Sequence, residues 1–253
     1  MNQRLLSMTL NVLALLVMGS PQLGGNAAAW TQAASDIKEA DRQFEKLYSK
    51  GNYDEAITIG ESLLELREKE LGREHPEVSQ LLVRLAALYR ATGDVAKAEA
   101  AYLRAIANGE KSLGPNHTSV GAALERFACL KRRTGHEGEA ESLQSRALSI
   151  LAPLPPGFRE GPVSGTVING KGITMAEPSY PKQADRLGAE GTVSVLVLID
   201  ETGRPITACT SVGPEVLALN AEAAAFKSRW TPTTLDKMPV KVNGQVNYNF
   251  KRR

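Results

Sequence analysis

Histidine is scarce in this chain, which has three histidines among 253 residues. Two of them, His75 and His117, occupy equivalent turn positions, where capping and packing explain them better than proton transfer does. The third is His136, and no metal-ligand spacing, phosphate-binding loop or nucleophile elbow occurs in the sequence. We therefore predict a non-enzymatic protein that uses no catalytic residue, metal or cofactor.

An excess of charge of one sign is also lacking, because 30 basic and 28 acidic residues leave a net charge of +2. Aromatic residues make up only 5% of the chain, and Trp30 and Trp230 are too isolated to form a stacking platform for bases. These features exclude nucleic acid as the expected partner. The apolar fraction of 42% is ordinary for a globular protein, so we do not expect global disorder.

Long hydrophobic runs are absent except near the N-terminus, where Leu5 to Met18 follows a weakly positive start. Small residues up to Ala29 offer a site for signal peptidase. Fourteen helical residues span roughly 21 Å, which is short for a bilayer core of about 30 Å. We predict that residues 1–29 are a cleaved export signal and that the protein is periplasmic. An uncleaved inner-membrane anchor facing the periplasm is the alternative.

Cysteine is limited to Cys129 and Cys209, and neither follows the apolar run as a bacterial lipid anchor would require. The two residues belong to different modules of the chain, so they can pair only if the modules dock. Two free, buried thiols are the expectation.

An internal repeat organises residues 30–152. Turns at Gly51, Gly93 and Gly135 follow one another at intervals of 42 residues, and the turn at Gly72 returns at Gly114 with the same offset. A period of this length is typical of stacked helical hairpins. The pattern stops near residue 151.

Each repeat divides into two amphipathic helices. Pro76 is placed to begin one helix and Gly93 to end it. The next helix is predicted over residues 95–113. Small residues at the equivalent positions Ala56, Ala98 and Ala140 would let neighbouring helices approach closely. The predicted buried faces are Leu81, Leu82, Leu85, Leu88 and Tyr89 on the first helix, and Ala98, Ala101, Tyr102, Ala105 and Ile106 on the second.

These strings resemble the tetratricopeptide family in its longer, 42-residue form known from kinesin light chains. The resemblance rests on the run from Leu81 to Tyr89, on Gly93-Asp94 and Ala98-Glu99, and on the turn from Leu113 to His117. It departs in the end copies, where Phe44 stands for a later alanine and Lys131 for Tyr89. The resemblance implies an all-α solenoid whose first helices line a concave surface that binds extended peptides.

Three arginines recur at one repeat position on the first helices: Arg42, Arg84 and Arg126. We predict that they form a ladder in the groove, which with Gln80 would favour carboxylate or phosphate groups of a partner. The alternative is that the arginines are solvated or paired with nearby acids, namely Glu39, Asp41, Glu45 and Glu125.

Residues 153–176 are rich in proline and glycine and are predicted to be a linker, with a short strand pair around Asn169-Gly170. Residues 177–253 follow a different period. Alternation over residues 192–199 predicts a buried strand, Asp200 to Gly203 a turn, residues 206–212 a second strand and residues 215–229 a helix. The final strand is predicted from its even-numbered apolar residues, Val240, Val242, Val246, Tyr248 and Phe250.

This second module is similar to the C-terminal domain of TonB-type energy transducers. The similarity rests on Tyr180-Pro181, Ala184, Gly188, Glu190 to Val193, Asp200, Gly203, Ala221, Ala224, Trp230, Pro232, Pro239-Val240, Tyr248 and Phe250. It implies a small α+β domain with a β-β-α-β antiparallel sheet, located in the periplasm. It also implies that a transporter segment adds a strand to the final strand, using Val240, Val242, Val246, Tyr248 and Phe250.

Three functional hypotheses follow. The first is a periplasmic adaptor that binds a partner peptide in its repeats and an envelope protein, such as an outer-membrane transporter, at its C-terminal edge strand. The second is a TonB-type energy transducer for transmembrane transport, which would need residues 5–18 as a retained anchor. The third is a cell-wall-associated protein whose C-terminal domain binds peptidoglycan or forms a dimer.

Overall fold

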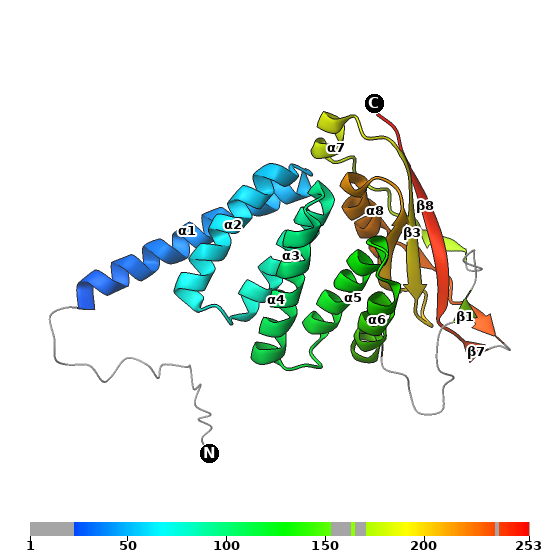
Figure 1. Ribbon diagram of the computed structural model, residues 1–253, viewed down its shortest axis with the longest axis horizontal. Helices are drawn as coiled ribbons and strands as arrows, with labels where there is room; N and C mark the ends of the chain where they lie inside the picture. The colour runs from blue at the N-terminus through cyan, green and yellow to red at the C-terminus, as the bar shows by residue number, and fades with distance from the viewer. Residues whose placement is uncertain (1–22, 153–162, 165–170, 236–237, 253) are drawn as a thin grey trace, which may run out of the picture.

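The computed structural model describes residues 23–152, 163–164, 171–235 and 238–252. Its first part is a series of helices in which each helix packs on the next, with α1 outermost (Figure 1). The predicted helical solenoid is therefore confirmed. The helices are α1 (Leu23–Ser49), α2 (Tyr53–Leu71), α3 (Pro76–Thr92), α4 (Val95–Leu113), α5 (Thr118–Arg133) and α6 (Glu137–Leu151).

The helix ends lie where the sequence predicts them. α3 begins at Pro76 and is followed by Gly93, whose φ of 89° lies in the left-handed region that glycine favours. α4 has the predicted bounds. His75 and His117 cap α3 and α5, because the Nδ1 of each ring accepts a hydrogen bond from the backbone N–H two residues later, at 3.3 and 3.1 Å. The capping role predicted for these two histidines is confirmed.

The core of the repeats consists of the predicted apolar faces. Leu81, Leu85 and Leu88 are each at most 1% exposed, and burying a leucine contributes roughly 1.5–3 kcal/mol. Ala56 and Ala98 are 0% exposed, so the small residues lie where helices meet closely. α1 (Leu23–Ser49) runs through Ala29, the boundary predicted for the export signal.

The C-terminal domain has the predicted order of strand, strand, helix and strand: β3 (Gly191–Ile199), β4 (Pro205–Val212), α8 (Glu215–Lys227) and β8 (Val242–Phe250). β3 is the antiparallel neighbour of both β4 and β8. The face of β3 with Val193, Val195 and Val197 is buried, and α8 packs across the strands. Figure 1 shows α8 between the repeats and the sheet.

Several short elements complete this domain. β1 (Val163–Ser164) pairs in parallel with the start of β8, and β2 (Gly172–Thr174) pairs with β5 (Arg229–Trp230). β1 and β2 lie within residues 153–176, the segment predicted to be a linker. α7 (Lys182–Leu187) precedes β3, and β6 (Thr234–Leu235) pairs with β7 (Met238–Pro239). The strand pair predicted around Asn169-Gly170 lies outside the described residues.

The final strand begins at Val242 rather than at Val240. The Val240 N–H donates instead to the carbonyl of Thr233 at 2.9 Å, so this residue continues the pairing of β6 with β7.

The two domains dock, and this overturns the expectation of two free thiols. Cys129 on α5 and Cys209 on β4 form a disulfide, with Cα atoms 5.6 Å apart. Sequence patterns could not show the pairing because they do not report which helix lies against which strand. The N-terminal side of α7 adds backbone contacts, since the N–H groups of Lys182 and Gln183 donate to the carbonyls of Lys50 and Gly51 at 3.2 and 2.8 Å.

None of the described helices combines the length and apolar content needed to cross a membrane. The apolar run over residues 5–18 lies outside the described residues.

Candidate functional site

A groove of about 360 Å³ lies on the repeat domain between α3 and α5. Gln80 and Arg84 of α3 and Arg126 of α5 line it, so the structure brings together three of the four residues predicted for the groove. Tyr48, Val83 and Ala123 supply apolar walls. The groove therefore combines amide and guanidinium donors with apolar surface, which suits an extended peptide that carries acidic groups.

The three repeat-equivalent arginines differ in their surroundings, and the predicted ladder is wrong for Arg42. The Arg42 side chain is 78% exposed, pairs with Glu39 at 2.6 Å and is absent from the groove lining. Arg84 pairs with Glu45, and its guanidinium lies 4.5 Å from the ring centre of Phe44. Pairing with neighbouring acids, the alternative to the ladder, therefore holds for Arg42 and Arg84.

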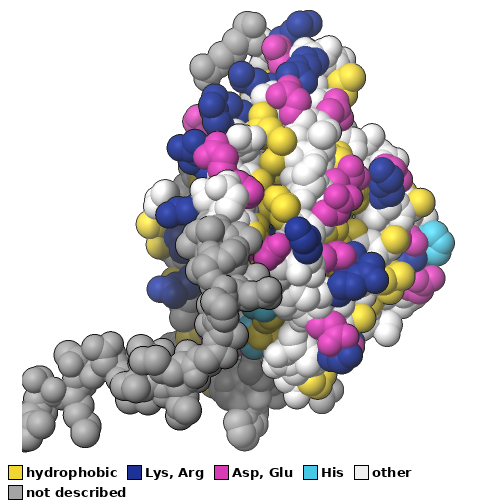
Figure 2. All heavy atoms as spheres, turned by 90° about the vertical axis from the view of Figure 1, so that its left-hand side faces the viewer, with side chains coloured by type: hydrophobic (Ala, Val, Ile, Leu, Met, Phe, Trp, Pro, Cys, Tyr) yellow, Lys and Arg dark blue, Asp and Glu magenta, His cyan; other side chains and the backbone are white. Residues whose placement is uncertain are grey.

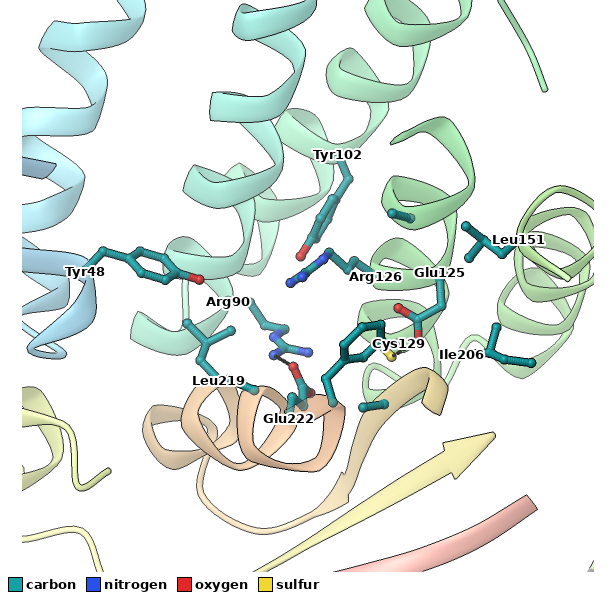
Figure 3. A pocket seen from close by; sticks show the side chains of 14 residues that line it. Tyr48, Arg90, Tyr102, Glu125, Arg126, Cys129, Leu151, Ile206, Leu219 and Glu222 are labelled. Carbon is teal, nitrogen blue, oxygen red and sulfur yellow. Dashed lines mark hydrogen bonds and ion pairs between the residues drawn. The ribbon is translucent and has the colours of Figure 1, made fainter. Parts of the chain in front are cut away.

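Arg126 is different because it makes no hydrogen bond or ion pair with any residue in the described part of the chain. It lines the groove and also a second hollow, a cleft of about 180 Å³ between the repeats and α8. The two hollows share Tyr48, Ala122 and Arg126, so Arg126 lies where they meet. Figure 3 shows the Arg126 guanidinium and the hydroxyls of Tyr48 and Tyr102 directed into the cleft.

A buried ion pair crosses the floor of this cleft. Arg90 of α3 is 3% exposed and donates to the Glu222 carboxylate of α8 at 2.7 Å. The other carboxylate oxygen of Glu222 accepts from the Thr210 N–H at 2.9 Å. Burial acts to raise the pKa of Glu222, but the charge and hydrogen bond of Arg90 outweigh it and lower that pKa below its usual value. Glu222 is therefore ionised at neutral pH.

Glu125 of α5 is the titratable group of the cleft. Burial raises the pKa of its carboxyl to about 7, and the neighbouring Arg126 opposes this shift only in part. The side chain is still partly exposed to the cleft. Its charge therefore changes within the physiological pH range.

β8 forms one edge of the sheet over most of its length. β1 pairs only with Val242 and Asn243, and within the described residues no other strand pairs with β8 on that side from Gly244 to Phe250. At the opposite edge, β4 contacts α5 and carries the cysteine that is bonded to it. Within the part of the chain that the structure describes, the repeats thus contact one edge of the sheet, and only β1 pairs with the β8 edge.

The residues predicted for the edge strand offer a partner their backbone groups more than their side chains. The side chains of Val242, Tyr248 and Phe250 are buried at 4–8% exposure, whereas Val240 and Val246 are half-buried. The even-numbered residues are apolar because they pack in the core. The exposed side chains of β8 are Gln245, Asn247 and Asn249.

The surface seen from the α1 end of the molecule carries basic and acidic side chains interspersed with one another (Figure 2). This face has no continuous field of one sign. Within the described residues, no group of three or more His, Cys, Asp or Glu side chains is placed to hold a metal ion.

Sequence reasoning missed the residues that join the two domains. Arg90 is a charged residue between the buried residues Tyr89 and Ala91, which is a weak local signal of a buried partner. Nothing local identifies Glu222 as that partner, because the two residues are 132 positions apart. The sequence predicts Glu125 only as an acid that could pair with an arginine.

Comparison with protein families agrees with both parts of the chain. Residues 176–252 match the family described as Gram-negative bacterial TonB protein C-terminal. Residues 47–111 and 77–152 each match the tetratricopeptide repeat. No curated protein matches the chain.

Proposed function

We propose that this chain, which joins tetratricopeptide repeats to a TonB-type C-terminal domain, is a non-enzymatic adaptor of the cell envelope. Its repeats hold a peptide of one partner, and its C-terminal domain engages a second partner by strand addition. Both families are in general non-catalytic and act through protein–protein contacts, which supports an interaction role.

The open edge of β8 is the observation that carries this proposal. Among the described residues, its backbone lies at the margin of the sheet from Gly244 onward, while α5 packs against the β4 margin. An edge strand offers N–H and C=O groups to an extended peptide. We therefore expect a partner strand to add to β8. Because α5 packs against β4, that margin is less able to pair with the sheet of another molecule.

Location in the periplasm is part of the proposal. It is supported by the apolar run and small residues near the N-terminus and by a disulfide, since disulfides persist in oxidising compartments. A second candidate function is energy transduction for outer-membrane transport, which the TonB-type family match favours. Mass spectrometry of the mature protein separates the two, because a retained segment over residues 5–18 in the inner membrane favours transduction. An N-terminus at Trp30 in the periplasmic fraction favours the adaptor.

Hydrogen–deuterium exchange of the full chain tests strand addition. The probe is a synthetic peptide that corresponds to the periplasm-facing segment of an outer-membrane transporter. We expect slower exchange at the amides of residues 244–250 and no change at residues 205–212. N-methylation of alternate peptide residues should remove this protection, because it removes backbone donors. Protection at β4 instead of β8 would contradict the proposal.

Fluorescence anisotropy with labelled octaglutamate tests the groove. We expect affinity to fall as salt rises and to be lost in the Arg84→Ala, Arg126→Ala double variant. Arg42→Ala is the matched control, since Arg42 has the same repeat position but lies outside the groove. Unchanged affinity in the double variant would remove the arginines from the proposed function.

A further inference from the structure

The cleft between the repeats and α8 contains polar groups that lack partners. Arg126 and the hydroxyls of Tyr48 and Tyr102 make no hydrogen bond with any described residue, and all three side chains line the cleft. Figure 3 shows them converging on one space above α8. Convergent donors in a small cavity are what an anionic group requires.

Among the residues that the structure describes, the charges around the cleft leave Arg126 as its uncompensated cation. Arg90 is neutralised by Glu222 at 2.7 Å, and Arg133, at the end of α5, is neutralised by Glu215. Of the described acids, the only other one that lines the cleft is Glu125, whose pKa of about 7 leaves it partly protonated at neutral pH. The cleft is therefore net positive at neutral pH and more so below it.

The size and walls of the cleft restrict what can enter. The cleft has a volume of about 180 Å³, which is smaller than the pockets of roughly 300–1,000 Å³ that drug-sized ligands occupy. Leu219, Ala223 and Phe226 of α8 form an apolar wall, and Phe226 is 51% exposed. The space thus suits one compact apolar group next to one anion.

We propose that this cleft is a binding site, built jointly by the repeats and the C-terminal domain, for a carboxylate attached to a compact apolar group. The Arg126 guanidinium and the hydroxyls of Tyr48 and Tyr102 donate to the carboxylate, and the apolar group lies against α8. The site goes beyond the adaptor function. It shares Tyr48 and Arg126 with the peptide groove, whereas Tyr102 and the α8 wall line the cleft and not the groove. Its ligand is either a free small acid or the carboxyl terminus of a polypeptide, because both present a carboxylate next to an apolar group.

Isothermal titration calorimetry of the full chain with sodium benzoate tests the proposal, with benzamide as the uncharged control. We expect benzoate to bind, benzamide to bind at least tenfold more weakly, and Arg126→Gln to abolish benzoate binding. Tyr102→Phe should weaken it several-fold, and Arg42→Gln should leave it unchanged. Equal binding of benzoate and benzamide, or wild-type affinity in Arg126→Gln, overturns the site. Arg126 and Arg42 are both exposed, so neither variant should unfold the protein.

Dependence on pH provides a second readout. The charges of Arg126, Glu222, Arg90 and Arg132 act on Glu125, and the pKa of Glu125, about 7, places its change of charge between pH 6 and 8. Protonation of Glu125 removes its repulsion of the ligand, so benzoate should bind more tightly at pH 6 than at pH 8. Glu125→Gln should remove this difference. Tighter binding at pH 8 contradicts the assignment.

Competition identifies the source of the carboxylate. A short peptide ending in leucine with a free carboxyl terminus should displace benzoate if the natural ligand is a chain end, and its carboxamide should not. Displacement by neither peptide, with benzoate binding intact, assigns the site to a free small acid. The octaglutamate assay tests the groove and the benzoate assay tests the cleft, so one proposal can fail while the other holds. Arg84 lines the groove and not the cleft, and Tyr102 lines the cleft and not the groove.

Discussion

Arg90 of the repeats donates a hydrogen bond to Glu222 of the C-terminal domain at 2.7 Å. The pair is almost fully enclosed, with side-chain exposures of 3% and 12%. An ion pair this deeply buried orients the two domains, because each charge would be costly without the other. It makes the repeats and the C-terminal domain one unit rather than two modules on a flexible tether.

Removal of one partner of this pair should be strongly destabilising. We expect Glu222→Ala to lower the free energy of unfolding by about 3–5 kcal/mol, because buried Arg90 then keeps only its 3.9 Å contact with Glu215, which also pairs with Arg133. Arg186→Ala is the control, since Arg186 pairs with Glu55 across the same interface but both side chains are 51% exposed, and we expect a loss of at most about 1 kcal/mol. Urea denaturation measures both values. Equal losses would contradict the buried role of the Arg90–Glu222 pair.

The disulfide should be detectable as a covalent link between the domains. The intact protein should be two hydrogens lighter than the reduced chain by mass spectrometry, and the unfolded oxidised protein should not react with iodoacetamide. Closing a loop between residues 80 positions apart is worth about 4.5 kcal/mol in the chain-entropy account, so reduction should lower the urea midpoint. A Cys129→Ser, Cys209→Ser variant, which cannot be oxidised, should be insensitive to reductant.

Glu125 should make stability depend on pH near neutrality. Its folded pKa of about 7 lies above the usual value of 4.5, so between these values the folded state binds more protons than the unfolded state. Its contribution to stability is fully present below about pH 4.5 and is lost as pH rises through 7. We expect Glu125→Gln to raise Tm at pH 8 and to change it little at pH 5. A larger gain at pH 5 would contradict the raised pKa.

Small residues at the helix contacts should not tolerate larger ones. Ala98 is 0% exposed, and Ala98→Leu should cost about 1–3 kcal/mol because the added atoms have no space. Ala96→Leu makes the same change on an exposed position of α4, and we expect it to be nearly neutral. Thermal unfolding followed by circular dichroism measures the difference. Similar effects at both positions would mean that the contact at Ala98 is loosely packed.

The helices and strands were largely predictable because their signals are local. The spacing of Leu81, Leu85 and Leu88, with Pro76 and Gly93 at the ends, specifies α3 within one short window. The alternation over residues 192–199 likewise specifies β3. The last strand was predicted two residues too long, because the side chain of Val240 fits the alternation while its N–H bonds to Thr233.

The groove was only partly predictable, for a related reason. Repeat spacing places Arg42, Arg84 and Arg126 on equivalent helix positions, but it does not report the acids beside each of them. The repeat position therefore predicts where on its helix an arginine lies. The neighbouring acids determine whether the arginine is paired within the chain or free to bind a partner.

The sequence by itself determined the solenoid, the β-β-α-β domain and the turns between their elements, since periodicity and the conformational preferences of proline and glycine act over a few residues. Only the tertiary structure decided that α8 lies against the repeats, that Cys129 meets Cys209, and that Arg126 faces a cleft without a partner. The contacts of Cys129 with Cys209 and of Arg90 with Glu222 join residues that are 80 and 132 positions apart. Burial and charge pairing stabilise such contacts, and neither leaves a pattern along the chain.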